Sequence, residues 1–352
     1  MGGRLQVTPP GEVDHSSHEQ SALDLASEQP LSADEARYVQ AARAANTLRG
    51  YRSDWREFTT WCHANDHESL PATAAAISAY LTVLAGHGAK VGTMSRRLSA
   101  IRFAHRLRDL PDPTENARVV AVWEGIRRTH TTRLAQAKPL MPPQLWDVLD
   151  GCPTEKTWKD PKRASEPHLV GLRDRAMILV GFVAALRRSE IVALNVDDLA
   201  EHPNGLVIQL DRSKTNQRGD VDELVVLPRG TVTRRCPVTA LRTWLDAAQV
   251  SEGPLFRAVS KGNRALDRRL VPRVVNDVVQ AAVERAGLVE PGADGGYSAH
   301  SLRAGFVTYA HSRGASDRAI AHQTRHRSLH TVGTYIRVDT AWDDNAATAL
   351  GL

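Results

Sequence analysis

The sequence predicts a mainly helical protein with an N-terminal helical domain and a C-terminal mixed α+β domain that contains a small antiparallel sheet. At 352 residues, 42% of them hydrophobic, the chain is long enough for about two domains that each bury a core. Apolar residues recur every three or four positions over much of the chain, which is typical of helices with one buried face. Two short apolar segments, 206–210 and 224–227, flank a polar stretch and predict a β-hairpin.

The first domain is expected over residues 33–130. Residues 1–32 are polar and acidic without periodicity, which is typical of a flexible tail. Four apolar stripes at helical spacing then predict a four-helix domain. The stripes consist of Leu48, Tyr51, Trp55, Phe58 and Cys62, then Ile77, Tyr80, Leu81 and Leu84, then Met94, Leu98 and Ile101, and last Val119, Val122, Trp123 and Ile126. Residues 131–143 have no such stripe and contain three prolines, which indicates a linker to a second domain over 144–352.

Charge is divided unevenly along the chain. Residues 1–42 hold two Arg against seven Asp or Glu, although the formal net charge of the chain is +5. Between Arg43 and Lys138, Lys and Arg outnumber Asp and Glu by 15 to 8. Such an excess favours a polyanion partner, while a solvated helix surface is the alternative for any single arginine. The arginines expected to contact phosphates are Arg49, Arg52, Arg96, Arg97, Arg102, Arg106, Arg127 and Arg128.

Composition argues against several classes of protein. No stretch approaches the roughly 18 uncharged residues of a membrane span, and the opening residues contain no apolar run behind a basic segment. We therefore expect a cytoplasmic protein with no membrane partner. Cys62, Cys152 and Cys236 are widely spaced and odd in number, which favours packed thiols over a disulfide framework or a zinc site.

Two segments of the second domain place a cation in an unusual context. Arg187 follows a long apolar run, where a guanidinium needs a partner, and Glu190 is on the next helical turn. The simpler explanation is a structural ion pair. Lys214 lies in the predicted hairpin, where most lysines are solvated.

The C-terminal part contains the other candidates. His300 and Arg303 are one helical turn apart, so both side chains can face one bound anion. His326 precedes Tyr335 by nine residues. Considered alone, Tyr335 would be a packed core or interface side chain.

Taken in order, these residues resemble the pattern of the tyrosine recombinase family, also called phage-type integrases. That pattern is an Arg in a Leu-Arg-x-Ser-Glu box, a Lys in a β-hairpin, H-x-x-R, and a His or Trp nine residues before a nucleophilic Tyr. Every position is filled here, by Ala185-Leu186-Arg187-Arg188-Ser189-Glu190, Ser213-Lys214-Thr215, His300-Ser301-Leu302-Arg303, His326 and Tyr335.

The chain departs from the family pattern at three places. Ala185 and Arg325 stand where many members have Gly. The polar segment from Thr154 to His168 looks like an inserted or lengthened loop. Residues 1–32 are too short and too acidic for a further folded domain, so the layout is similar to the Cre-type or Xer-type recombinases rather than the lambda-type integrases.

The resemblance implies a DNA-binding role for the first domain, whose Tyr51-Arg52-Ser53-Asp54-Trp55 is similar to the first helix of the family's core-binding domain. It makes the second domain catalytic. The expected roles are phosphate binding for Arg187 and Arg303, general base for His300, general acid for Lys214, a hydrogen bond to phosphate for His326, attack on phosphorus for Tyr335, and support of the first box for Glu190.

The resemblance also implies the reaction and the partners. We expect exchange of DNA strands between two sites, in integration, excision or resolution, with no metal, ATP or other cofactor. The expected partners are double-stranded DNA target sites and further copies of the chain. The protein is expected to form a homotetramer on paired DNA sites and to be a monomer or dimer off DNA. Residues 346–352 are expected to form a helix given to a neighbouring copy or packed in cis. The alternatives are a telomere resolvase or type IB topoisomerase, and a DNA-binding regulator that has lost catalysis.

Overall fold

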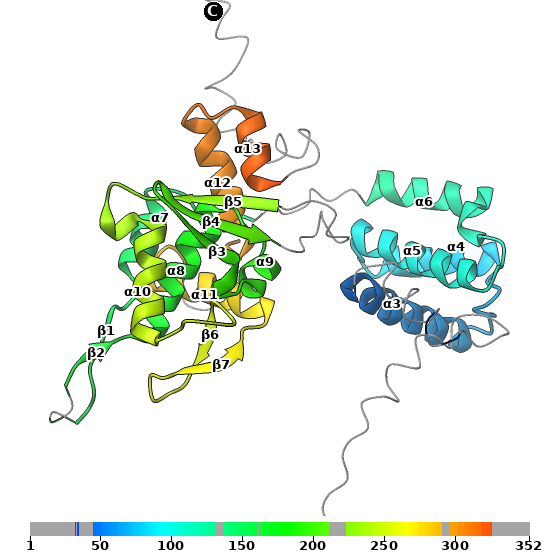
Figure 1. The fold of residues 1–352 in the computed structure, drawn as a ribbon. Coiled ribbons are helices and arrows are strands. Elements are labelled where there is room, and N and C mark those ends of the chain that lie inside the picture. Colours follow the sequence, from blue (N-terminus) through cyan, green and yellow to red (C-terminus); the bar gives the residue numbers. More distant parts are fainter. Residues whose placement is uncertain are drawn as a thin grey trace, which may run out of the picture. The chain divides into compact units, whose positions relative to one another are not determined.

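The chain forms two compact units in a computed structural model, Met1–Leu134 and Ala135–Leu352 (Figure 1). The described residues are 32, 34, 45–130, 137–160, 162, 164–210, 223–290 and 296–325. Helices dominate both units in these ranges, and the strands form small antiparallel sheets in the second unit. The predicted fold class is confirmed.

The first unit is helical and contains the four predicted helices. These are α3 (Ala45–Ala64), α4 (Ala74–Gly86), α5 (Val91–Leu107) and α6 (Ala117–Thr129). Except for Leu48 and Tyr51, the residues of the predicted apolar stripes meet in one core, where Phe58 of α3 and Tyr80 of α4 have ring centroids 5.1 Å apart. Polar caps fix where two of the helices begin, because Thr73 accepts a hydrogen bond from the Ala76 N–H and Asn116 accepts one from the Arg118 N–H.

His105 is a buried polar residue within this core. Its Nε2 accepts a hydrogen bond from the Ala72 N–H at 2.9 Å, so the proton of the neutral ring is on Nδ1, which donates to the Ile101 carbonyl at 2.8 Å. Burial lowers the pKa of His105, because the charged ring loses its hydration, and the Ile101 hydrogen bond and the charge of Asp112 only partly oppose this effect. The folded state therefore favours the neutral form of His105.

Acid is expected to destabilise the first unit through His105. Because its pKa is lowered in the fold, its contribution to the free energy of unfolding is complete above the unfolded pKa of about 6.5 and is lost as pH falls toward the folded value. Scanning calorimetry from about pH 7.5 to about pH 5 should show a steeper fall of the Tm for the wild type than for His105→Gln. His63→Gln, at an exposed position of α3, is the control and should keep the wild-type slope. Equal slopes for the wild type and His105→Gln would contradict this prediction.

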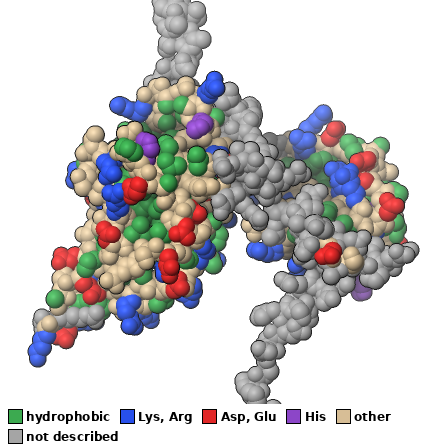
Figure 2. All heavy atoms as spheres, in the orientation of Figure 1, with side chains coloured by type: hydrophobic (Ala, Val, Ile, Leu, Met, Phe, Trp, Pro, Cys, Tyr) green, Lys and Arg blue, Asp and Glu red, His purple; other side chains and the backbone are tan. Residues whose placement is uncertain are grey.

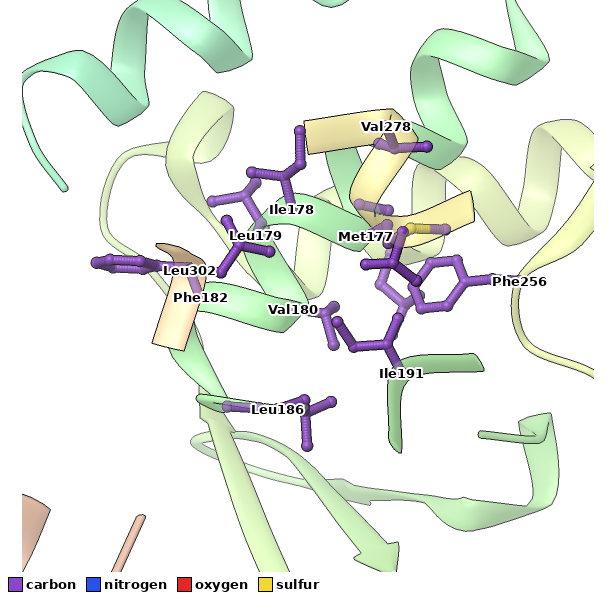
Figure 3. Close-up of a cluster of buried hydrophobic side chains, with 14 of the residues drawn as sticks. Met177, Ile178, Leu179, Val180, Phe182, Leu186, Ile191, Phe256, Val278 and Leu302 are labelled. Atoms are coloured by element: carbon purple, nitrogen blue, oxygen red, sulfur yellow. The ribbon is translucent and has the colours of Figure 1, made fainter. Parts of the chain in front are cut away.

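The second unit is built around one helix that is buried over most of its surface. α8 (Leu169–Val183) is apolar around most of its circumference because other helices contact it on several sides, among them α10, α11 and α12. Figure 3 shows Met177, Ile178 and Val180 of α8 packed in a cluster with Phe256 and Leu302. The other helices of this unit are α7 (Gln144–Asp150), α9 (Arg188–Ala193), α10 (Pro237–Ala248), α11 (Pro272–Arg285), α12 (His300–Ser312) and α13 (Asp317–Thr324).

The predicted hairpin is confirmed as two strands of a three-stranded antiparallel sheet. β4 (Gly205–Leu210) pairs with β5 (Glu223–Pro228), and Ile208 lies opposite Val225. Both of these side chains are buried, because alternate residues of each strand face the core. The sequence did not predict the third strand, β3 (Leu199–His202), which pairs with the other edge of β4.

Two short antiparallel ribbons complete the strands of the described residues. β6 (Arg257–Val259) pairs with β7 (Ala265–Arg269), and β1 (Glu155–Lys156) pairs with β2 (Glu166–Pro167). The β1–β2 ribbon lies within the segment expected to be an inserted loop, and it projects from the body of the unit (Figure 1).

The predicted linker is too long at its C-terminal end. The Lys138 N–H donates to the Gly296 carbonyl and the Leu140 N–H donates to the Ser301 carbonyl. Leu140 is completely buried in the core of the second unit. A Cβ at Gly305 would lie 2.0 Å from the Leu140 carbonyl oxygen, so the helix needs glycine there. Residues 137–143 therefore belong to the second unit, because one apolar side chain among the prolines anchors them.

The surface carries charges of both signs. Among the described residues on the face shown in Figure 2, both Lys and Arg side chains and Asp and Glu side chains are visible on each unit. Within the described ranges, no helix is both long enough and apolar enough to cross a lipid bilayer.

Candidate active site

The first box of the sequence pattern forms a turn between α8 and α9. Ala185 has a positive φ of 48°, and Leu186 behind it is completely buried. Arg187 stands directly before α9, where Glu190 accepts a hydrogen bond from its backbone N–H at 2.8 Å and one from Nη1 at 2.6 Å. This double contact resembles a capping box, in which a Glu in the first turn binds the N-cap backbone. The Arg187–Glu190 ion pair, which is the simpler explanation that the sequence offers, is therefore present. It fixes the Arg187 guanidinium through Nη1.

The H-x-x-R segment forms the start of α12. His300 is the first residue of the helix and is exposed, whereas Arg303 is 1% exposed. Nη1 of Arg303 donates to the Ala185 carbonyl at 2.6 Å, and Nη2 donates to the Thr324 carbonyl. Arg303 thus joins α12 to the first box and to the end of α13.

Arg325 is a residue of this site that the sequence analysis did not select. It follows α13 in the left-handed region, with φ 56°, and its side chain is 6% exposed. Nη2 lies 2.7 Å from Glu190 Oε2, and Nε lies 3.6 Å from Oε2 of Glu223, the first residue of β5. The only signal in the sequence was a departure, since many members of the family have Gly at this position.

The buried charges of the site determine its protonation. Burial alone would raise the pKa of Glu190, but the charges of Arg325 and Arg187 outweigh it and hold that pKa below the ordinary value. Burial lowers the pKa of Arg325, and Glu190 opposes the shift. We therefore treat Glu190 as an anion between two guanidiniums.

Four of the seven expected catalytic and supporting residues lie in the described part of the chain: Arg187 and Glu190 are in direct contact, Arg303 contacts the backbone of the first box, and His300 lies one helical turn before Arg303. Lys214, His326 and Tyr335 lie outside the described residues. Lys214 belongs to the segment between the paired ends of β4 and β5, and His326 directly follows Arg325 in sequence.

The expected phosphate-binding arginines of α5 have partners within the first unit. Arg96 binds the buried carboxylate of Asp54 through two hydrogen bonds, at 2.7 and 2.9 Å, and its side chain is still 54% exposed. The remaining pairs are Arg97 with Glu57 and with the Tyr80 hydroxyl, Arg102 with Thr114 and Asp112, and Arg106 with Asp112.

The other arginines selected for DNA contact lie on α3 and α6. Arg49, Arg127 and Arg128 are exposed and Arg52 is half-buried. Contact with phosphate stays a prediction for both sets, and it requires the α5 arginines to use nitrogens beyond those bound to carboxylates.

The described residues of the site define the kind of ligand that it can bind. The buried carboxylate of Glu190 holds the guanidiniums of Arg187 and Arg325, and Arg303 contacts the backbone of the same two segments, so the described residues offer cationic groups for an anion such as a phosphate group. No group of three or more His, Cys, Asp or Glu side chains could hold a metal ion in the part of the chain that the structure describes.

Comparison with known families identifies the chain. The model of the "Phage integrase family" matches residues 162–341, and that of the "Phage integrase, N-terminal SAM-like domain" matches residues 36–107. An integrase/recombinase xerD homolog of Selenomonas ruminantium is 34% identical over 313 residues, which cover 88% of this chain and 86% of that protein. The chain therefore belongs to the phage integrase family.

More distant relatives match over most of the chain. Tyrosine recombinase XerD of Rhizobium meliloti (strain 1021) is 24% identical over 85% of this chain and 87% of its own length. Among solved structures, XerH site-specific recombinase bound to a palindromic difH substrate has a TM-score of 0.56 at 17% identity, over 80% of this chain and 73% of that one. A lambda integrase dimer bound to a COC′ core site has a TM-score of 0.53 at 15% identity, over 86% and 93%. These two structures show that the fold is shared.

Proposed function

We propose that the protein is a site-specific tyrosine recombinase, which cuts and rejoins DNA through a 3′-phosphotyrosyl bond to Tyr335. The observation that carries this proposal is the position of Arg303. Its guanidinium contacts the backbone of the first box and the backbone two residues before His326. The first box, the H-x-x-R segment and the end of α13, which are far apart in sequence, therefore meet at one guanidinium.

Arg187 and Arg303 are assigned to the scissile phosphate. A phosphodiester carries a negative charge that repels nucleophiles, and the transition state places more charge on its non-bridging oxygens. Two guanidiniums stabilise that charge through paired hydrogen bonds. Glu190 limits the orientations open to Arg187, so part of the ordering cost is met before DNA binds.

Proton transfer is assigned to three other residues. A tyrosine hydroxyl has a reference pKa of about 10, so attack near neutral pH needs a base. His300, exposed at the start of α12, takes the Tyr335 proton as the oxygen attacks phosphorus. The bond from phosphorus to the 5′ oxygen breaks, and Lys214 protonates that oxygen while His326 donates a hydrogen bond to the phosphate.

The same proposal covers partners and location. Religation to another strand reverses these steps and needs no ATP, because the phosphotyrosyl bond conserves the energy of the broken bond. The first unit binds the duplex target site, and four copies act on two paired sites, with monomers or dimers off DNA. The reaction takes place on DNA in the cytoplasm.

A nicked suicide substrate tests the proposed chemistry. When the protein cuts next to a nick, a short fragment with the free 5′ hydroxyl diffuses away, so the covalent complex accumulates. We expect DNA that flanks the gene to give a protein–DNA adduct on a denaturing gel, in equal amount with and without EDTA. Mass spectrometry should place the attached nucleotide on Tyr335. An absent adduct, a requirement for divalent metal, or attachment at another residue would overturn the proposal.

A further inference from the structure

Arg325 joins three segments that the proposed cleavage reaction needs. Its Nη2 binds Glu190 Oε2, the same oxygen that accepts the Arg187 backbone N–H. Its Nε faces Glu223, where the chain enters β5 after the segment that contains Lys214. Arg325 also directly precedes His326. One buried side chain thus contacts the first box and the base of the hairpin from the segment that leads to His326 and Tyr335.

The backbone conformation of Arg325 indicates that its side chain has a specific role beyond packing. A φ of 56° disfavours residues with a Cβ and favours glycine, the residue that many family members have there. A buried guanidinium also loses its hydration. The backbone conformation and the loss of hydration both disfavour arginine at this position. The ion pair with Glu190 at 2.7 Å, in contrast, needs a cationic side chain there.

We propose that Arg325 is a positioning residue for DNA cleavage, which holds Glu190 so that Arg187 stays at the scissile phosphate. This inference rests on the proposed function. Without Arg325, the contacts to Arg187 are those that Glu190 keeps among the described residues, and its carboxylate can rotate together with the guanidinium that it orients. A small misplacement of a group that binds the reacting phosphate lowers the rate of the chemical step more than the affinity for DNA.

The test measures the rate of adduct formation at saturating suicide substrate for Arg325→Met, together with the Kd for the same DNA. We expect cleavage to slow by about tenfold or more while the Kd stays within about twofold. Arg325→Gly suits the left-handed backbone and removes the same ion pair, so it should slow cleavage similarly and keep the fold if Arg325→Met unfolds.

A matched control separates positioning from general stability. Arg173 forms another buried ion pair in the same unit, with Asp174 at 2.7 Å, and its side chain is 9% exposed. Arg173→Met removes a buried charge in the same way and should cleave at the wild-type rate when it is folded. Equal slowing in Arg173→Met and Arg325→Met would assign the effect to stability and overturn the inference.

A double variant tests whether Arg325 acts through Glu190. If it does, Arg325→Met combined with Glu190→Gln should cleave no more slowly than Glu190→Gln alone. The inference would be overturned if the double variant cleaved more slowly than Glu190→Gln by the full factor of Arg325→Met. It would also be overturned if Arg325→Met and Arg325→Gly both cleaved at a rate within less than about tenfold of wild type. Failure of the wild type to form any adduct would instead overturn the proposed function, so the two failures are distinguishable.

Discussion

Tyr335→Phe is expected to eliminate the covalent protein–DNA adduct and all strand exchange, with DNA affinity within about twofold of wild type. The change removes a single oxygen atom, and that oxygen forms the bond to phosphorus in the proposed mechanism. Arg187 and Arg303 can still bind the phosphate, so the complex should form without cleavage. The measurement is adduct yield on the suicide substrate, beside a gel-shift titration of the same DNA.

Tyr309→Phe is the control for loss of a hydroxyl. Tyr309 lies on α12 and is half-buried, and it has no role in the proposed chemistry. It should form the adduct at the wild-type rate. Adduct formation by Tyr335→Phe at the wild-type level would show that another residue is the nucleophile.

Arg303→Ala is expected to slow cleavage by about 10²- to 10³-fold or more, because the transition state loses a positioned cation. Removal of one oxyanion donor has that effect in other enzymes, and a guanidinium supplies both charge and hydrogen bonds. The change also leaves the Ala185 and Thr324 carbonyls without this donor, and an unsatisfied buried group costs about 1–3 kcal/mol of stability. Rates should therefore be measured below the Tm of the variant.

Two further variants interpret the Arg303 result. Arg303→Lys keeps the charge but not the paired hydrogen bonds, so its rate should fall between wild type and Arg303→Ala. Arg313, exposed at the end of α12, is the control for loss of an arginine from the same helix, and Arg313→Ala should cleave normally. A rate for Arg303→Ala within a few-fold of wild type would exclude its assignment to the phosphate.

The parts of the fold that the sequence predicted are those specified by local patterns. The stripes of α3 to α6 repeat at helical spacing, and β4 and β5 are close in sequence, so their positions follow from neighbouring residues. β1 and β2 have two residues each, too few for a recognisable alternation. The sequence places Leu140 in the linker, because one apolar residue among three prolines does not form a recognisable helix or strand pattern.

The candidate site divides in the same way. Arg187 and Glu190 are three residues apart, and His300 and Arg303 share one helical turn, so the sequence could pair them. Arg325 and Glu190 are 135 residues apart, and no local pattern indicates that they meet. The excess of Lys and Arg between Arg43 and Lys138 likewise indicated the arginines of α5 but not the carboxylates that bind them, because those partners come from other elements.

The attachment of Leu140 gives the second unit a mechanical property. The chain that arrives from the first unit is fastened at Leu140 to the Ser301 carbonyl, one residue after His300, and is seated against Gly305 of the same helix. A pull on that chain would therefore reach the Gly296 carbonyl through Lys138 first and then, through Leu140, the first turn of α12, the helix that carries His300 and Arg303.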